Sequence, residues 1–179
     1  MDIAQLIKTF YYYAGNVGLH HNDTDYESHV PLGVVAIAGY YDSPLLSISA
    51  KLAAALATGN TCLIVPHRLT PISAYMLLNI CVQSGVPSGV VNLVASNSDE
   101  IYKLIAADPS INCVCYDGRV QLGQELIVSH SFQDPNKRTL FSFEGKSSLV
   151  VYESADIDSA VEAIIDGCFY ANGQVSQIK

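Results

Sequence analysis

The sequence predicts an α/β fold, an open and mostly parallel five-stranded sheet with helices on both faces. Short β-branched runs alternate with segments whose apolar residues recur at helical spacing, which is typical of parallel β-α-β units. Glycine and proline mark the boundaries of these segments. The chain has 179 residues, of which 50% are hydrophobic and 15% charged, and this length and composition suffice for one large core.

The first half of the chain predicts a helix followed by two strand–helix units. Ser43 and Thr70 are expected N-caps, because each precedes a proline that suits the first position of a helix. The expected elements are a helix over about 3–13, a strand over 33–39, a helix from 44 that ends at Gly59, a strand over 61–66 and a helix from 71 that ends at Gly85.

The second half continues the alternation and then adds a short strand–helix extension. We expect strands over 89–95, 111–116 and 138–143, a helix that Ser98 caps and Pro109 ends, and a helix over about 120–128. Beyond Gly145 we expect a strand over 148–153, a helix that Asp156 caps, and a loop over 171–179. The expected buried face of that last helix consists of Ile157, Val161, Ile164 and Ile165.

Charge and cysteine content narrow the class of protein. The formal net charge of −8 argues against binding to nucleic acid or to an anionic membrane surface. The longest apolar stretch is interrupted by Pro31, Gly33 and Gly39, and no signal peptide is evident, so we expect a cytoplasmic protein without membrane spans. The five cysteines form no C-x-x-C pair and are expected to be buried, reduced thiols.

Candidate ligand-binding residues follow the strands, because open parallel sheets bind ligands beyond the carboxyl ends of their strands. No G-x-G-x-x-G, Walker A or G-x-S-x-G motif is present. Gly118 and Gly123 bracket a helix start whose backbone amides would hold a phosphate, although a plain turn explains the two glycines equally well. His20, His21 and His29 lie in one polar stretch without a fourth ligand, so we expect no metal site.

Several stretches of the sequence resemble the aldehyde dehydrogenase superfamily, in order and over nearly the whole chain. They are PLGVVAIAG, SPLLSISAKLAAALATGNTCLIVP, TPISAYMLL, SGVPSGVVNLV, DGRVQLG, FEGKSSLVVYESADIDSAVE and NGQVSQ. The resemblance implies a Rossmann-like coenzyme-binding domain over 1–145, with an N-terminal helix, and the start of a truncated catalytic-domain-like region over 146–179. Within the superfamily, the chain most resembles the degenerate second copy of the family-16 members.

The resemblance also implies that the catalytic residues of the family are replaced. Ser176 stands at the position of the nucleophilic cysteine, two residues after Gly-Gln, and Ser142 at that of the general-base glutamate. Glu144, two residues further on, is a weaker candidate for that base. Asp42 replaces the asparagine that stabilises the oxyanion, and an ionised carboxylate would repel a developing negative charge there.

The coenzyme contacts that the resemblance implies are also altered. The family's Lys-Pro-Ser-Glu reads Val65-Pro66-His67-Arg68, and valine does not hydrogen-bond a ribose hydroxyl. Arg119 replaces a small serine beside the coenzyme pyrophosphate, where it would either fill the phosphate groove or pair with a phosphate. Weak cofactor-binding candidates are therefore Gly118, Arg119, Gly123, Pro66 and His67.

Three functions follow from these replacements. In the leading hypothesis the chain is a non-catalytic domain with a structural or interaction role, which packs on another aldehyde-dehydrogenase-like domain or subunit in an oligomer and needs no cofactor. In the alternative it is the coenzyme-binding part of an NAD-dependent aldehyde dehydrogenase whose catalytic residues lie elsewhere. A third hypothesis has Arg119, His67 and Arg68 binding another nucleotide or anion.

Overall fold

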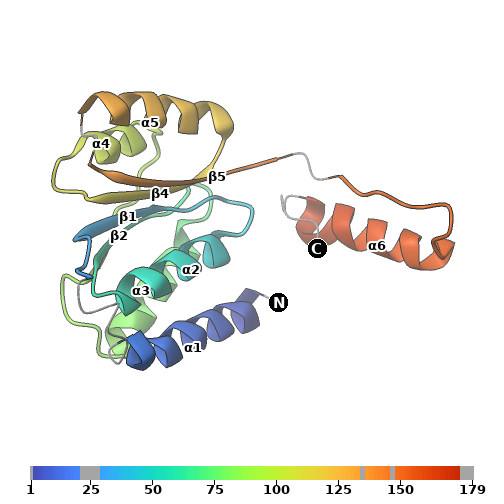
Figure 1. The fold of residues 1–179 in the computed structure, drawn as a ribbon. Helices are drawn as coiled ribbons and strands as arrows, with labels where there is room; N and C mark the ends of the chain where they lie inside the picture. Colours follow the sequence, from blue (N-terminus) through green and yellow to red (C-terminus); the bar gives the residue numbers. More distant parts are fainter. Residues whose placement is uncertain (1, 21–28, 134–135, 146–147, 174–179) are drawn as a thin grey trace. The chain divides into compact units, whose positions relative to one another are not determined.

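A computed structural model describes residues 2–20, 29–133, 136–145 and 148–173 of the chain (Figure 1). Contacts between residues divide the chain into two compact units, Met1–Phe143 and Glu144–Lys179. The first unit contains α1 (Asp2–His20), β1 (Val34–Ala38), α2 (Pro44–Ala57), β2 (Thr61–Val65), α3 (Pro71–Gln83), β3 (Val91–Leu93), α4 (Glu100–Ala107), β4 (Cys113–Gly118), α5 (Val120–Gln133) and β5 (Arg138–Phe143). The second contains α6 (Ile157–Phe169) and the short 3-10 helix η2 (Tyr170–Gly173).

The strands form one parallel sheet in the order β3-β2-β1-β4-β5. The chain runs outward from β1 to β3 and then returns to the other side of β1 with β4, so the strand order reverses between β1 and β4. The predicted open, parallel, five-stranded sheet is confirmed. In such sheets a ligand crevice lies beyond the carboxyl ends of the strands at the point of reversal.

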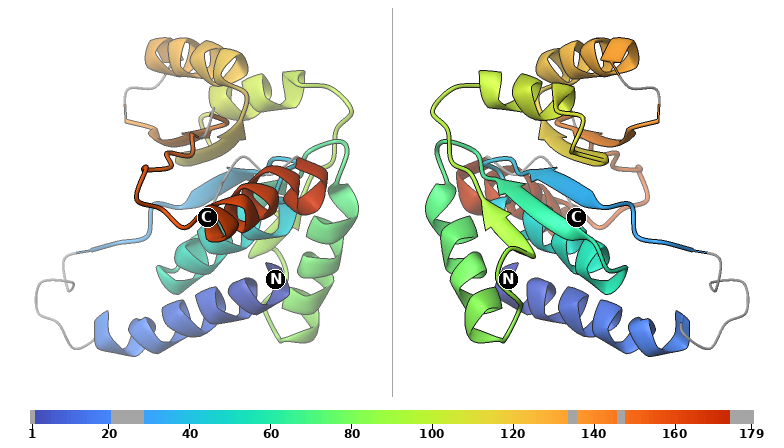
Figure 2. Two further views of the ribbon diagram at one scale, coloured as in Figure 1. Left: turned by 90° about the vertical axis from the view of Figure 1, so that its right-hand side faces the viewer. Right: turned by 90° about the vertical axis from the view of Figure 1, so that its left-hand side faces the viewer.

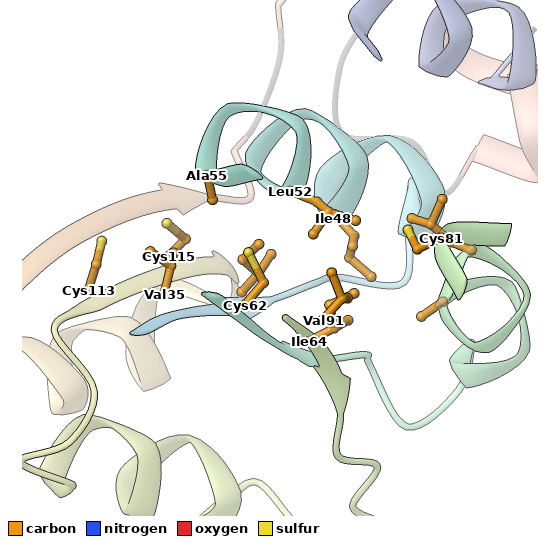
Figure 3. Packing of buried hydrophobic residues seen from close by; sticks show 13 residues of the cluster. Val35, Ile48, Leu52, Ala55, Cys62, Ile64, Cys81, Val91, Cys113 and Cys115 are labelled. Carbon is orange, nitrogen blue, oxygen red and sulfur yellow. The ribbon is translucent and has the colours of Figure 1, made fainter. Parts of the chain in front are cut away.

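Helices α2 and α3 cover one face of the sheet, and α1 packs on α2 (Figures 1 and 2). Ile48 and Leu52 of α2 are completely buried and point toward the strands, where Ile64 of β2 belongs to the same cluster (Figure 3). The same cluster contains the four buried cysteines, Cys62, Cys81, Cys113 and Cys115, all of them free thiols. The prediction of buried thiols is confirmed for these four and is wrong for Cys168, which is exposed.

Helices α4 and α5 cover the opposite face (Figure 2). Tyr102 of α4 and Leu126 of α5 pack on the small side chains of β1. The rings of Tyr102 and Tyr116 meet edge to face, with their centroids 5.7 Å apart. Because both faces are covered, strands β1, β2 and β4 are mainly apolar along their whole length, as a buried parallel sheet requires.

The element boundaries differ from the predictions at several ends. The N-terminal helix extends to His20, well beyond the predicted end near residue 13, so this histidine lies in a helix and not in a loop. Ser43 and Thr70 precede their helices but make no side-chain capping hydrogen bond. Asp156 does cap its helix, because its Oδ1 accepts a hydrogen bond of 2.8 Å from the Ser159 amide.

The second unit corrects two predictions. Residues 148–152 are not a strand, because a β-strand needs a neighbouring strand for its backbone hydrogen bonds and none pairs with this segment in the described part of the chain. The predicted apolar face of α6 exists but is not buried, since Ile157 is 76% and Val161 47% exposed. Residues 171–173 form part of η2 rather than a loop. Over the described ranges, no helix is both long and apolar enough to cross a membrane.

Candidate functional site

Loops from three neighbouring strands meet at the carboxyl edge of the sheet. Ala38 of β1 is in register with Val65 of β2 on one side and with Tyr116 of β4 on the other. The residues that follow these three positions therefore lie side by side at the point where the strand order reverses. They include the predicted site residues Asp42, Pro66, His67, Gly118 and Arg119. We call this region, formed by residues 39–43, 66–68 and 117–120, the crevice.

His67 is packed as part of an aromatic group in the crevice. Its ring centroid lies 5.4 Å from that of Tyr40 and 5.3 Å from that of Tyr41. Its Nδ1 accepts a hydrogen bond of 3.3 Å from the Leu69 amide, which requires the imidazole to be unprotonated at that nitrogen. Burial lowers the pKa of His67, and the neighbouring Arg68 lowers it further. At neutral pH the ring is therefore uncharged and offers a phosphate no positive charge.

An ion pair joins α2 to the end of β4. Lys51 Nζ donates a hydrogen bond to Asp117 Oδ2 and another, of 3.2 Å, to the carbonyl of Ser47. The side chains of Lys51 and Asp117 are only 17% and 12% exposed. Burial raises the pKa of Asp117, against the opposing effect of Lys51, and the charge of Asp42 raises it further. The other oxygen, Asp117 Oδ1, is buried without a hydrogen-bond partner among the described residues.

A second ion pair joins the residue after β4 to the residue before α4. Arg119, between β4 and α5, places its Nη2 2.5 Å from Oδ2 of Asp99, which precedes α4. The backbone carbonyl of Arg119 also accepts a hydrogen bond of 3.4 Å from the hydroxyl of Tyr116. The sequence predicted that Arg119 either fills the phosphate groove or pairs with a phosphate, and in the structure its side chain pairs with the carboxylate of Asp99. This pairing and the neutral His67 count against the hypothesis of an anion site built on Arg119, His67 and Arg68.

Packing explains the two glycines of the predicted phosphate turn. A Cβ at Gly118 would lie 2.5 Å from the hydroxyl oxygen of Tyr116, and one at Gly123 would overlap the ring of Phe143. Real Cβ atoms do not approach other atoms so closely, so a side chain at either position would require the neighbouring ring to move. The glycine spacing alone therefore does not indicate a phosphate site.

The predicted catalytic positions are brought together only in part. Asp42 lies in the crevice, where its Oδ1 accepts hydrogen bonds from the amide (2.7 Å) and the hydroxyl (3.3 Å) of Ser43. Ser142 lies on β5 in register with Asp117 and is exposed, whereas Glu144 follows the end of β5 in the second unit. Ser176 and His21 lie outside the described residues. The four buried thiols belong to the core of the sheet and not to the crevice.

Lys51, Asp99 and Asp117 form ion pairs in or beside the crevice, and sequence reasoning gave none of them a role. Asp117 directly follows the apolar run that ends at Tyr116, and a charged residue at the end of a buried strand is a usable signal. Lys51 lies on an otherwise mainly apolar helix, four residues after Ser47. Neither signal names a partner, because the two residues of each ion pair are far apart in the sequence: Lys51 and Asp117 by 66 positions, Arg119 and Asp99 by 20.

Comparisons with known proteins agree with this architecture. Residues 1–177 match the model of the aldehyde dehydrogenase family. The chain is 32% identical to mouse retinaldehyde dehydrogenase 3 over 97% of its own length and 35% of the mouse protein. It is also 32% identical to aldehyde dehydrogenase [NAD(P)+] 2 of Saccharomyces cerevisiae over 97% of its length and 36% of the yeast protein. The chain thus spans about a third of the length of these relatives.

Solved structures give the same result. A variant of aldehyde dehydrogenase from Bacillus cereus superposes with a TM-score of 0.86 at 26% identity, over 99% of this chain and 37% of that one. The NAD+ complex of aldehyde dehydrogenase from Bacillus cereus superposes with a TM-score of 0.78 at 30% identity, over 84% of this chain and 30% of that one.

Proposed function

The chain belongs to the aldehyde dehydrogenase family, and on that premise we propose that it is a non-catalytic domain of the family with a structural or protein-interaction role. The observation that carries this proposal is the presence of two carboxylates in the crevice. Asp42 lies in the loop after β1, and Asp117 lies in β4 next to its last residue. Ionised carboxylates accept hydrogen bonds but donate none, so they do not stabilise an oxyanion.

Two further replacements support the same proposal. Ser142 and Ser176 stand where the family has its base and its nucleophile. A serine hydroxyl becomes a nucleophile only beside a strong base, whereas a cysteine thiolate forms near neutral pH. In this proposal the chain resembles the second copy of family-16 members because both lack the catalytic residues of the family. Its partner is another aldehyde-dehydrogenase-like domain or subunit.

The alternative function is that of a coenzyme-binding part whose catalytic residues lie elsewhere. It is supported by the relatives whose names include NAD(P)+ or an NAD+ complex and by the retained parallel sheet. The residues that would hold the coenzyme here are Gly118, Arg119, Gly123, Pro66 and His67. Pro66 is buried, His67 packs against Tyr40 and Tyr41, and Arg119 pairs with Asp99, so these side chains fit NAD poorly.

The proposal also includes a location. The buried free thiols of the sheet suit the reducing cytoplasm, where disulfides seldom persist. An acidic chain with a net charge of −8 is likewise proposed to bind neither nucleic acid nor an anionic membrane surface.

The test replaces Asp42, Ser142 and Ser176 together with alanine in the native protein and measures aldehyde oxidation by the appearance of NADH. We expect the rate to equal that of the unaltered protein, because these positions supply no chemistry. Loss of one residue that acts in the transition state costs about a hundredfold or more in rate. A fall of that size, with the fold preserved by circular dichroism, would show that these residues catalyse.

A further inference from the structure

Two ion pairs flank the crevice, one on each face of the sheet. Lys51 of α2 holds Asp117 on the face that α2 and α3 cover, and Arg119 holds Asp99 on the face that α4 and α5 cover. Arg68, on the loop after β2, is exposed and makes no ion pair within the described ranges, so the paired cations at this edge are Lys51 and Arg119. Both are thus engaged by carboxylates of the chain itself.

An anionic ligand needs these same groups. Phosphate oxygens are bound in proteins by guanidinium and ammonium groups, which offer charged hydrogen-bond donors. To bind Lys51 or Arg119, a phosphate would have to displace the carboxylate of Asp117 or that of Asp99. The displaced Asp117 would remain largely buried, and its Oδ1 already lacks a hydrogen-bond partner among the described residues. Leaving a buried carboxylate without its cation is costly.

We infer that Asp117 and Asp99 are the residues that exclude anionic nucleotides from the crevice, by occupying Lys51 and Arg119 in place of phosphate groups. The inference rests on the proposed non-catalytic function and adds the device that enforces it. It assigns a specificity role to two carboxylates on opposite faces of the sheet. It also implies that anion binding can be restored by removing negative charge, without building any new contact.

The experiment titrates ADP and NAD by calorimetry into the whole chain and into the variants Asp99→Asn, Asp117→Asn and the two combined. Asparagine keeps the size of the side chain and removes its charge. We expect the double variant to bind ADP at least about tenfold more tightly than the unaltered chain, and the gain to shrink with added salt. Adding Arg119→Ala to the double variant should weaken ADP binding again, because the guanidinium that would bind the phosphate is removed.

The matched control is Glu125→Gln. Glu125 Oε2 lies 3.2 Å from Lys103 Nζ, and this pair also joins α5 to α4, but outside the crevice. The control removes one negative charge from the same pair of helices and should leave ADP binding unchanged. If Asp117→Asn does not fold, Asp99→Asn is tested alone. This variant frees only Arg119, so it should bind ADP more tightly than the unaltered chain, with a smaller gain than that expected of the double variant.

The outcomes separate this inference from the proposed function. Tight NAD binding by the unaltered chain would contradict the proposed function. Weak binding by the unaltered chain and by a folded double variant alike would overturn the inference and leave the proposed function standing. A gain equalled by Glu125→Gln would also overturn it, because overall charge and not the two ion pairs would then be responsible.

Discussion

The interior of the sheet and its carboxyl edge differ in how their residues are used. In the interior, apolar side chains from β1, β2 and β4 pack against helices on both faces, and Ile37, Ile48, Leu52 and Ile64 are completely buried. At the edge, Lys51 pairs with Asp117 and Arg119 pairs with Asp99. The residues that stabilise the fold are thus different from those that a ligand at the edge would meet. The two kinds of residue follow each other directly in β4, where the buried Tyr116 precedes Asp117.

The largest expected effect comes from the interior. Ile64→Ala removes most of a completely buried side chain and should lower the free energy of unfolding by about 3 kcal/mol, measured by urea denaturation. At the edge, Asp99→Asn breaks an ion pair whose side chains are 53% and 44% exposed, and it should cost less than about 1 kcal/mol. Equal losses from the two variants would remove the distinction between interior and edge.

The smaller expected effect concerns His67 and pH. Burial lowers the pKa of its imidazole, so the folded chain binds fewer protons at this site than the unfolded chain. The stability that His67 contributes is therefore fully present above the ordinary pKa of histidine, near pH 6.5, and is lost as the pH falls through the lower pKa of the folded state.

Thermal unfolding between neutral and mildly acidic pH measures this effect. The melting temperature of the unaltered chain should fall more steeply with acidification than that of His67→Gln. The matched control is His29→Gln, at an exposed residue that precedes β1, and it should keep the steep profile. Identical profiles for the unaltered chain and His67→Gln would show that the packing of His67 against the tyrosines does not disfavour its charged form.

The order and type of the elements in the first unit could be predicted from the sequence, because each strand and helix carries its own local signal. Val34–Ala38 and Thr61–Val65 are β-branched runs between glycines or prolines, and the helices after them begin at Pro44 and Pro71. The strand expected over 148–153 was wrong for the opposite reason, since a strand depends on a partner that no local pattern supplies.

The candidate site could be located from the sequence but not understood from it. The rule that ligands bind beyond the carboxyl ends of parallel strands identified Asp42, His67 and Arg119, and the strand register places all three at one edge. That Arg119 pairs with Asp99, and that Lys51 pairs with Asp117, depends on contacts between different elements. Such contacts follow from the packed structure and leave no periodic pattern in the sequence.

The most direct test of the central claim is a calorimetric titration of NAD into the unaltered chain at neutral pH and low salt. We predict no saturable heat up to about 1 mM NAD, because Lys51 and Arg119 already hold carboxylates. Saturable binding in the low-micromolar range would contradict the claim and would identify the chain as a coenzyme-binding domain.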